Sequence, residues 1–118
     1  MKAGPHSGAL EAIERVLNRG GEADDVLREV VDVLHERLRR PVRVRFLEDG
    51  ELVPGPSAGS IPADVETFPI HFQGAYVANL EVGLPLGDGD RPLLERVATI
   101  VAPYALVAWD TGGERWEP

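Results

Sequence analysis

Two neighbouring stretches near the middle of the chain alternate between apolar and polar positions. Their apolar members are Phe68, Ile70, Phe72, Tyr76, Ala78, Leu80 and Val82. A period of two is typical of strands that bury one face. Gly74 can adopt the positive φ of a tight turn, so residues 66–83 predict a hairpin that reverses at Gln73-Gly74. Pro69 cannot donate to a β-ladder, which predicts that the first arm is an edge strand.

Two stretches before this hairpin have the spacing of amphipathic helices. Their apolar positions are Leu10, Ile13, Val16 and Leu17 in the first, and Val26, Leu27, Val30, Val31, Leu34 and Leu38 in the second. The first helix covers residues 9–18 and ends at Gly20-Gly21. The second begins with an acidic first turn at Asp24 and stops before Pro41.

A second hairpin is predicted between these helices and the central one. Residues 42–47 alternate, the Glu-Asp-Gly segment 48–50 is a strong reversal signal, and residues 51–53 form a short return strand. Residues 54–64 contain three prolines and two glycines without periodicity. We therefore expect a loop there, without a helix.

The C-terminal part predicts one long helix after a linker at residues 84–89. Asp88 or Asp90 can cap this helix. Residues 100–109, IVAPYALVAW, are apolar nearly all round, and such a helix requires burial on every side. Pro103 lies inside that run and should kink the helix or remove one backbone bond, at a cost of roughly 3 kcal/mol.

Together these elements predict an α+β fold, in which an antiparallel sheet of four to five strands carries the N-terminal and C-terminal helices on one face. With 118 residues and 43% apolar content, the chain is long enough for one domain with a core and too short for two. We place that domain at residues 9–110, between a flexible N-terminus at residues 1–8 and a flexible tail at residues 111–118.

Charge and composition exclude several kinds of partner and site. The formal net charge of −8 disfavours nucleic acid and anionic membranes. The chain has no cysteine, which removes disulfides, thiolate metal sites and thiol nucleophiles. Its three histidines are scattered and predict neither a metal site nor a cofactor. There is no apolar leader and no run long enough to span a bilayer, so we expect a cytoplasmic protein.

The polar face of the predicted sheet carries the candidate ligand site. Arg43, Arg45 and His71 would form a shallow site for an anion or small molecule, and Asn79 would supply hydrogen bonds. The alternative is a solvated face on which Arg and Glu residues pair across strands. Both interpretations require these side chains to point away from the helices.

The apolar C-terminal helix is a candidate for contact with a second copy of the chain. The residues expected at this twofold interface are Leu10, Ile13, Leu17, Val101, Ala105, Ala108 and Trp109. The alternative is a helix that its own sheet and first helix enclose completely. Two short helices and four strands offer little cover for it, which favours the dimer.

The order of elements resembles that of a GAF domain, a sensory relative of the PAS fold. The resemblance covers about residues 9–109. The segments that carry it are 26–38 leading into 42–50, Phe68-Pro69-Ile70, Gly74, Ala78-x-Leu80-x-Val82 and 93–108. The chain departs from the family where Ala78 replaces the usual Gly and where only residues 54–65 fill the place of a longer segment that roofs the ligand.

The resemblance implies a non-enzymatic regulatory or sensory module that acts through homodimerisation or through a protein partner in a signalling pathway. A second hypothesis is a sensor of a small anionic ligand or nucleotide on the polar sheet face. A third is enzymatic, because some GAF-like proteins reduce methionine sulfoxide; these use cysteines, and this chain has none. Roadblock/longin domains combine similar elements but have a helix between strand pairs, where we expect a loop.

Overall fold

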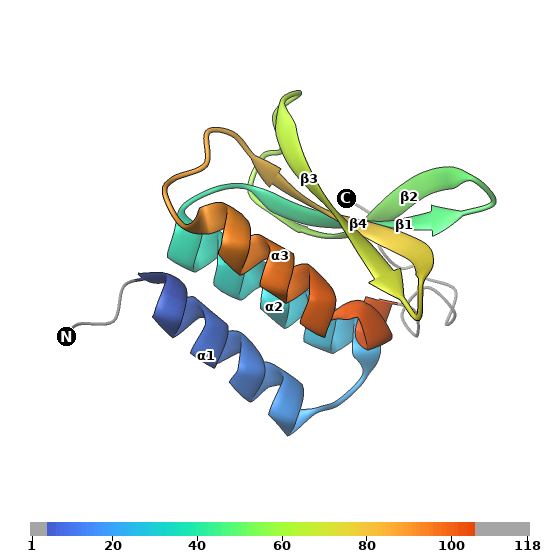
Figure 1. Cartoon of the computed structure of the whole chain (residues 1–118), viewed down its shortest axis with the longest axis horizontal. Coiled ribbons are helices and arrows are strands. Elements are labelled where there is room, and N and C mark those ends of the chain that lie inside the picture. The colour runs from blue at the N-terminus through green and yellow to red at the C-terminus, as the bar shows by residue number, and fades with distance from the viewer. Residues whose placement is uncertain (1–4, 106–118) are drawn as a thin grey trace.

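The computed structural model describes residues 5–105 (Figure 1). Its elements are α1 (Pro5–Arg19), α2 (Ala23–Leu38), β1 (Val42–Glu48), β2 (Glu51–Ala58), β3 (Val65–Phe72), β4 (Ala75–Gly83) and α3 (Asp90–Ile100). Helix α1 begins four residues before the predicted domain boundary at residue 9, whereas the predicted tail at 111–118 lies outside the described residues. Within the described part, no helix combines the length and apolar character that a bilayer crossing needs.

The four strands form one antiparallel sheet in the order β2-β1-β4-β3. Figure 1 shows all three helices on the same side of this sheet. Helix α2 packs on β1 and β2, α3 packs on β3 and β4, and α1 forms an outer layer against α2 and α3. The predicted α+β architecture is confirmed, and β3 is an edge strand as Pro69 predicted.

The core lies between the sheet and the helices. Strand positions that face the helices are buried, and they are Val42, Val44, Phe46, Phe68, Ile70, Ala78, Leu80 and Val82. They pack against the apolar stripes of the helices, whose most buried members include Ile13, Leu27, Leu34 and Leu94. Burial of such side chains supplies about 1.5–3 kcal/mol each, which makes this single layer the main source of stability.

Both predicted hairpins are present with tight turns. Asp49 and Gly50 have φ angles of 53° and 82°, and Gln73 and Gly74 have φ angles of 53° and 86°. Two successive residues with positive φ are characteristic of the type I′ turn, whose twist matches that of antiparallel strands. The Gly at each second position is therefore explained by backbone geometry.

The loop predicted at residues 54–64 is wrong in its first half, because β2 continues to Ala58. Prolines interrupt a sheet only where their missing N–H is needed, and β2 lies at an edge. The pairing of β2 with β1 contains one extra residue between the partners of Arg43 and Arg45. Gly55 lies in this bulge, where an added Cβ would come within 2.5 Å of the carbonyl oxygen of Val44.

The C-terminal helix is interrupted near Pro103, as predicted: α3 ends at Ile100, and the part of the predicted helix beyond residue 105 lies outside the described residues. A separate helical turn follows at residues 102–105, where the N–H groups of Tyr104 and Ala105 both donate to the carbonyl of Val101, at 2.9 and 3.0 Å. Pro103 has no N–H to continue the α-helical ladder, which accounts for the break.

Candidate functional site

Polar side chains from the two central strands meet on the face of the sheet that carries no helix. In the register of β1 with β4, Arg43 lies opposite Glu81 and Arg45 lies opposite Asn79. Intervening residues such as Val44 are buried against the helices, so strand alternation turns these four polar side chains to the opposite face. The structure thus brings together Arg43, Arg45 and Asn79, three of the four predicted ligand-binding residues.

Two arginines share one buried carboxylate at the centre of this face. Arg43 Nε donates to Glu81 Oε1 at 2.6 Å, and Arg45 Nη2 donates to Glu81 Oε2 at 2.7 Å. Arg45 Nε also lies 3.1 and 3.2 Å from the two carboxylate oxygens. The Glu81 side chain is only 2% exposed, whereas the arginine side chains are 30% and 31% exposed. The cluster therefore presents a net positive charge at a fixed position.

The environment of Glu81 keeps it ionised. Burial alone would raise the pKa of this carboxyl group, because it disfavours the charged form. Hydrogen bonds from Arg45 and Arg43, together with their charges, outweigh that effect and hold the pKa of Glu81 below its ordinary value of 4.5. Glu81 is thus a permanent anchor for both guanidinium groups near neutral pH.

Tyr76 also lies on the helix-free side, although its alternation with Ala78 predicted a position facing the helices. In the pairing of β3 with β4, Ile70 lies opposite Ala78 and His71 lies opposite Tyr76, so Val77 has no partner. This bulge turns the Tyr76 side chain to the opposite face of the sheet. Tyr76 is 38% exposed, its hydroxyl donates to Asn79 Oδ1 at 2.6 Å, and its ring centroid lies 5.6 Å from that of His71. The bulge could not be foreseen from periodicity alone.

The alternative interpretation, a solvated polar face, is wrong at the centre of this face. Glu81 and Asn79 are 1% and 5% exposed. The predicted pairing of Arg with Glu across strands is present, but it forms a buried ion cluster instead of a set of surface pairs. Sequence alternation shows which face a side chain takes, and burial depends on what surrounds it.

A hollow of about 320 Å³ lies beside the two arginines, and we call it the arginine hollow. Its lining residues are Arg43, Arg45, Leu52, Pro54, Gly55, Ser57 and Ile61. Most of these come from β2, and Ile61 belongs to the connection between β2 and β3. The cationic groups lie on the β1 side, and much of the remaining wall is apolar. This wall could not be predicted from the sequence, because residues 54–64 have no apolar–polar periodicity and indicated a loop.

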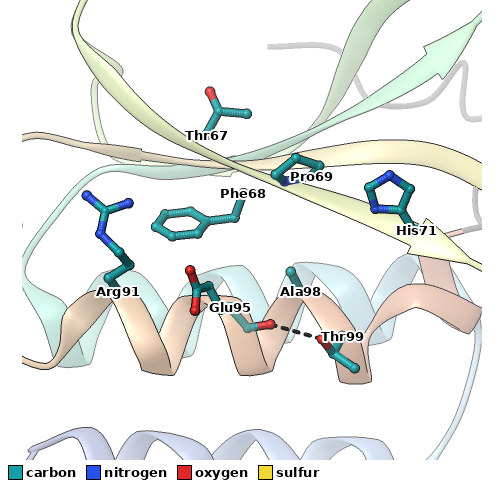
Figure 2. Close-up of a pocket in the computed structure, with 8 residues that line it drawn as sticks. All are labelled: Thr67, Phe68, Pro69, His71, Arg91, Glu95, Ala98 and Thr99. Atoms are coloured by element: carbon teal, nitrogen blue, oxygen red, sulfur yellow. Dashed lines mark hydrogen bonds between the residues drawn. The ribbon is translucent and has the colours of Figure 1, made fainter.

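A second hollow of about 330 Å³, which we call the edge hollow, lies between β3 and α3 (Figure 2). Its lining residues are Thr67, Phe68, Pro69, His71, Arg91, Glu95, Ala98 and Thr99. Figure 2 shows Phe68 directed from the strand toward the helix, and the Arg91 guanidinium lies 5.9 Å from the centre of its ring. Arg91 is paired with Glu66 at 2.5 Å, so its charge is already neutralised. His71 therefore lines a different hollow from the other predicted ligand-binding residues.

The residues expected at a dimer interface lie mainly inside the chain. Ile13, Val101 and Ala105 are at most 1% exposed and belong to the core. Leu10 and Leu17 are partly buried and pack against that core, while the predicted contacts at positions 108 and 109 lie outside the described residues. The twofold contact stays a prediction, and the buried side chains have a structural role without it.

Among residues 5–105, no group of three or more His, Asp or Glu side chains is close enough to hold a metal ion. This part of the chain therefore offers a cationic cluster and two hollows as its candidate sites.

Comparison with known proteins supports the fold. No protein-family model matches the chain, and no curated protein sequence matches it. The structure is similar to that of fRMsr, a free methionine-R-sulfoxide reductase, from Staphylococcus aureus, solved in complex with its substrate. The two are 14% identical, with a TM-score of 0.70, and the match covers 89% of this chain and 98% of the reductase chain. The fold is GAF-like, as the resemblance implied.

The same comparison corrects the expected function. The resemblance implied a non-enzymatic sensory or regulatory module in a signalling pathway, whether it acted through partners or sensed an anionic ligand or nucleotide. A solved structure that shares the fold is that of an enzyme. We therefore abandon the signalling role. An identity of 14% establishes the shared fold, and the chemistry of this chain has to be argued from its own residues.

Proposed function

We propose that this chain is a minimal GAF-type enzyme domain that acts on a small carboxylate-containing molecule, bound on the helix-free face of the sheet. The observation that carries the proposal is the Arg43–Glu81–Arg45 cluster beside the arginine hollow. The expected cytoplasmic location is part of the same proposal.

The electrostatics of the cluster support an anionic substrate group. Guanidinium groups form strong, directional hydrogen bonds with carboxylates, and Glu81 holds both groups in place before a ligand arrives. The chain as a whole carries a formal charge of −8, so a fixed positive site stands out against its average charge. The hollow of about 320 Å³ falls at the lower end of ligand pockets, which span roughly 300–1,000 Å³.

Free methionine sulfoxide is the first substrate to test, because a solved structure that shares the fold belongs to a reductase of this free amino acid. It carries the carboxylate that the arginines would bind. None of the 118 residues is cysteine, so the chain has no thiol of its own to reduce a sulfoxide. We therefore propose that the chain binds and positions the substrate while an added dithiol supplies two electrons and two protons. The dithiol is oxidised to its disulfide, and the sulfoxide oxygen leaves as water.

The test combines calorimetry with a turnover assay. Wild-type protein is titrated with the two sulfoxide epimers of methionine and with other free amino acids, and methionine formation is followed with dithiothreitol as the reductant. We expect saturable binding and turnover above the protein-free rate. Arg45→Gln should weaken binding by roughly tenfold or more, because it removes one of the two positive charges that balance Glu81 and leaves the cluster without a net positive charge.

Arg19→Gln is the matched control, since it removes the same charge from an exposed pair with Glu29 on the outer helix layer. It should leave both readouts unchanged. Binding without turnover of any compound would contradict the enzymatic part of the proposal. Failure of every compound to bind would contradict all of it.

A further inference from the structure

We infer that Arg43 is the residue that docks the carboxylate, and that the preferred ligand is a monocarboxylate whose apolar body lies along β2. This inference rests on the proposed function and specifies the class of substrate and its orientation. It follows from the difference between the two arginines and from the order of side chains along the arginine hollow.

The two arginines use their donors differently. Arg45 directs both Nε and Nη2 to Glu81, so one edge of its guanidinium is occupied by that carboxylate. Arg43 contributes only Nε, at 2.6 Å. Among residues 5–105, no acceptor is found for Nη1 or Nη2 of Arg43. A pair of Nη donors matches the two oxygens of a carboxylate, so Arg43 can hold a ligand while it remains anchored to Glu81.

The wall of the arginine hollow changes from polar to apolar along the strands. Along β2, Ser57 lies opposite Arg43, Pro54 lies opposite Arg45, and Leu52 lies opposite Leu47. Each pair shares the helix-free face because register partners point to the same side. The pair formed by Arg43 and Ser57 and the pair that contains Leu52 are four residues apart on β1. At about 3.3 Å per residue, this separation is roughly 13 Å.

This gradient specifies a ligand with one charged end. A carboxylate on Arg43 places the rest of the molecule against Pro54, Leu52 and Ile61, which line the same hollow. The two arginines and Glu81 together carry a net charge of +1, which suits one carboxylate and provides poorly for the several charges of a nucleotide. The same orientation places the side chain of a free amino acid along the apolar wall.

The experiment measures affinity across a series of ligands with increasing chain length. Acetate, butyrate, hexanoate and octanoate are titrated into the full-length protein by calorimetry, with hexanol as the uncharged control. We expect affinity to rise by up to about fourfold per buried methylene until the hollow is filled. Hexanol should bind at least about tenfold more weakly than hexanoate, because it lacks the group that Arg43 holds.

Two variants test the two ends of the site separately. Arg43→Lys keeps the charge but loses the paired donors, and it should weaken hexanoate binding by roughly tenfold. Ile61→Ser should flatten the dependence on chain length while leaving acetate binding unchanged. Thermal unfolding checks that each variant is folded, and Arg19→Gln serves as the charge control.

The outcomes distinguish this inference from the proposed function. Equal binding of hexanol and hexanoate, or wild-type binding by Arg43→Lys, would overturn the inference. If methionine sulfoxide is turned over but affinity depends on neither chain length nor Arg43, the inference fails and the enzymatic proposal stands. If carboxylates bind as described but no compound is turned over, the enzymatic proposal fails and the docking role of Arg43 stands.

Discussion

Glu81 is the residue on which the candidate site depends most. Its carboxylate is buried and accepts hydrogen bonds from both Arg43 and Arg45, so it fixes two guanidinium groups at once. Without this anion the arginines would repel each other and take up other rotamers. The anchor also explains how an acidic chain keeps a positive site on one face of its sheet.

Replacement of Glu81 by Gln should lower the free energy of unfolding by about 3 kcal/mol at neutral pH, typical of removing one partner from a buried ion pair. The folded pKa of Glu81 lies below its ordinary value of 4.5, so the stabilising contribution is present above about pH 4.5 and is lost as the pH falls through the folded pKa. The difference between wild type and Glu81→Gln should therefore shrink in acid. Denaturant unfolding at a series of pH values checks this, and a difference that stays constant into acid would contradict it.

At the residue scale, the sequence predicted which strand positions face away from the helices, because alternation alone decides this. Arg43, Arg45 and Asn79 were placed correctly for that reason. Tyr76 was misplaced, since the bulge at Val77 leaves no mark on the apolar–polar pattern. The burial of Glu81 was also missed, because it depends on neighbours that are distant in sequence.

Among the elements, β2 shapes the site more than the sequence suggested. Its bulge beside Arg43 and Arg45 lets Gly55 approach the backbone of β1 more closely than any side chain would allow. This close approach positions Pro54 and Ser57 opposite the two arginines. The strand therefore acts as the apolar wall of the arginine hollow as well as an edge of the sheet.

Gly55→Ala should destabilise the protein by about 1–3 kcal/mol, because its Cβ would lie 2.5 Å from the carbonyl oxygen of Val44 and the backbone would have to move. Gly8→Ala is the matched control. Gly8 lies in α1, where an added Cβ meets only the flexible end of Arg37, at 2.9 Å. We expect Gly8→Ala to stabilise by up to about 1 kcal/mol through helix propensity. Thermal unfolding of both variants measures these changes in stability. If Gly55→Ala leaves the stability unchanged, the close packing of β2 against β1 is contradicted.

At the element scale, the sequence predicted both hairpins and the edge position of β3, because Gly at the second turn position and Pro69 leave clear local signals. It missed the length of β2, since prolines that usually mark loops are also tolerated at a sheet edge. It predicted that Pro103 would disturb the last helix, and the helix ends before this residue.

For the whole molecule, the arrangement of layers gives the two faces of the sheet different roles. One face is occupied by the helices and forms the core, while the other carries the arginine cluster. The fold class could be predicted from periodicity, because a small α+β layer follows from where apolar residues lie. The class of function could not, since the resemblance implied a sensory role and a solved structure with the same fold is a reductase.

The central claim is that a small carboxylate binds beside Arg43 on the helix-free face. Nuclear magnetic resonance of isotope-labelled protein tests it most directly, with hexanoate and free methionine sulfoxide as titrants and with backbone and arginine side-chain N–H signals observed. We predict saturable shifts at Arg43, Arg45, residues 52–57 and Ile61, and none around Arg91 in the edge hollow. Shifts centred on the edge hollow, or no saturable shifts with either compound, would contradict the account.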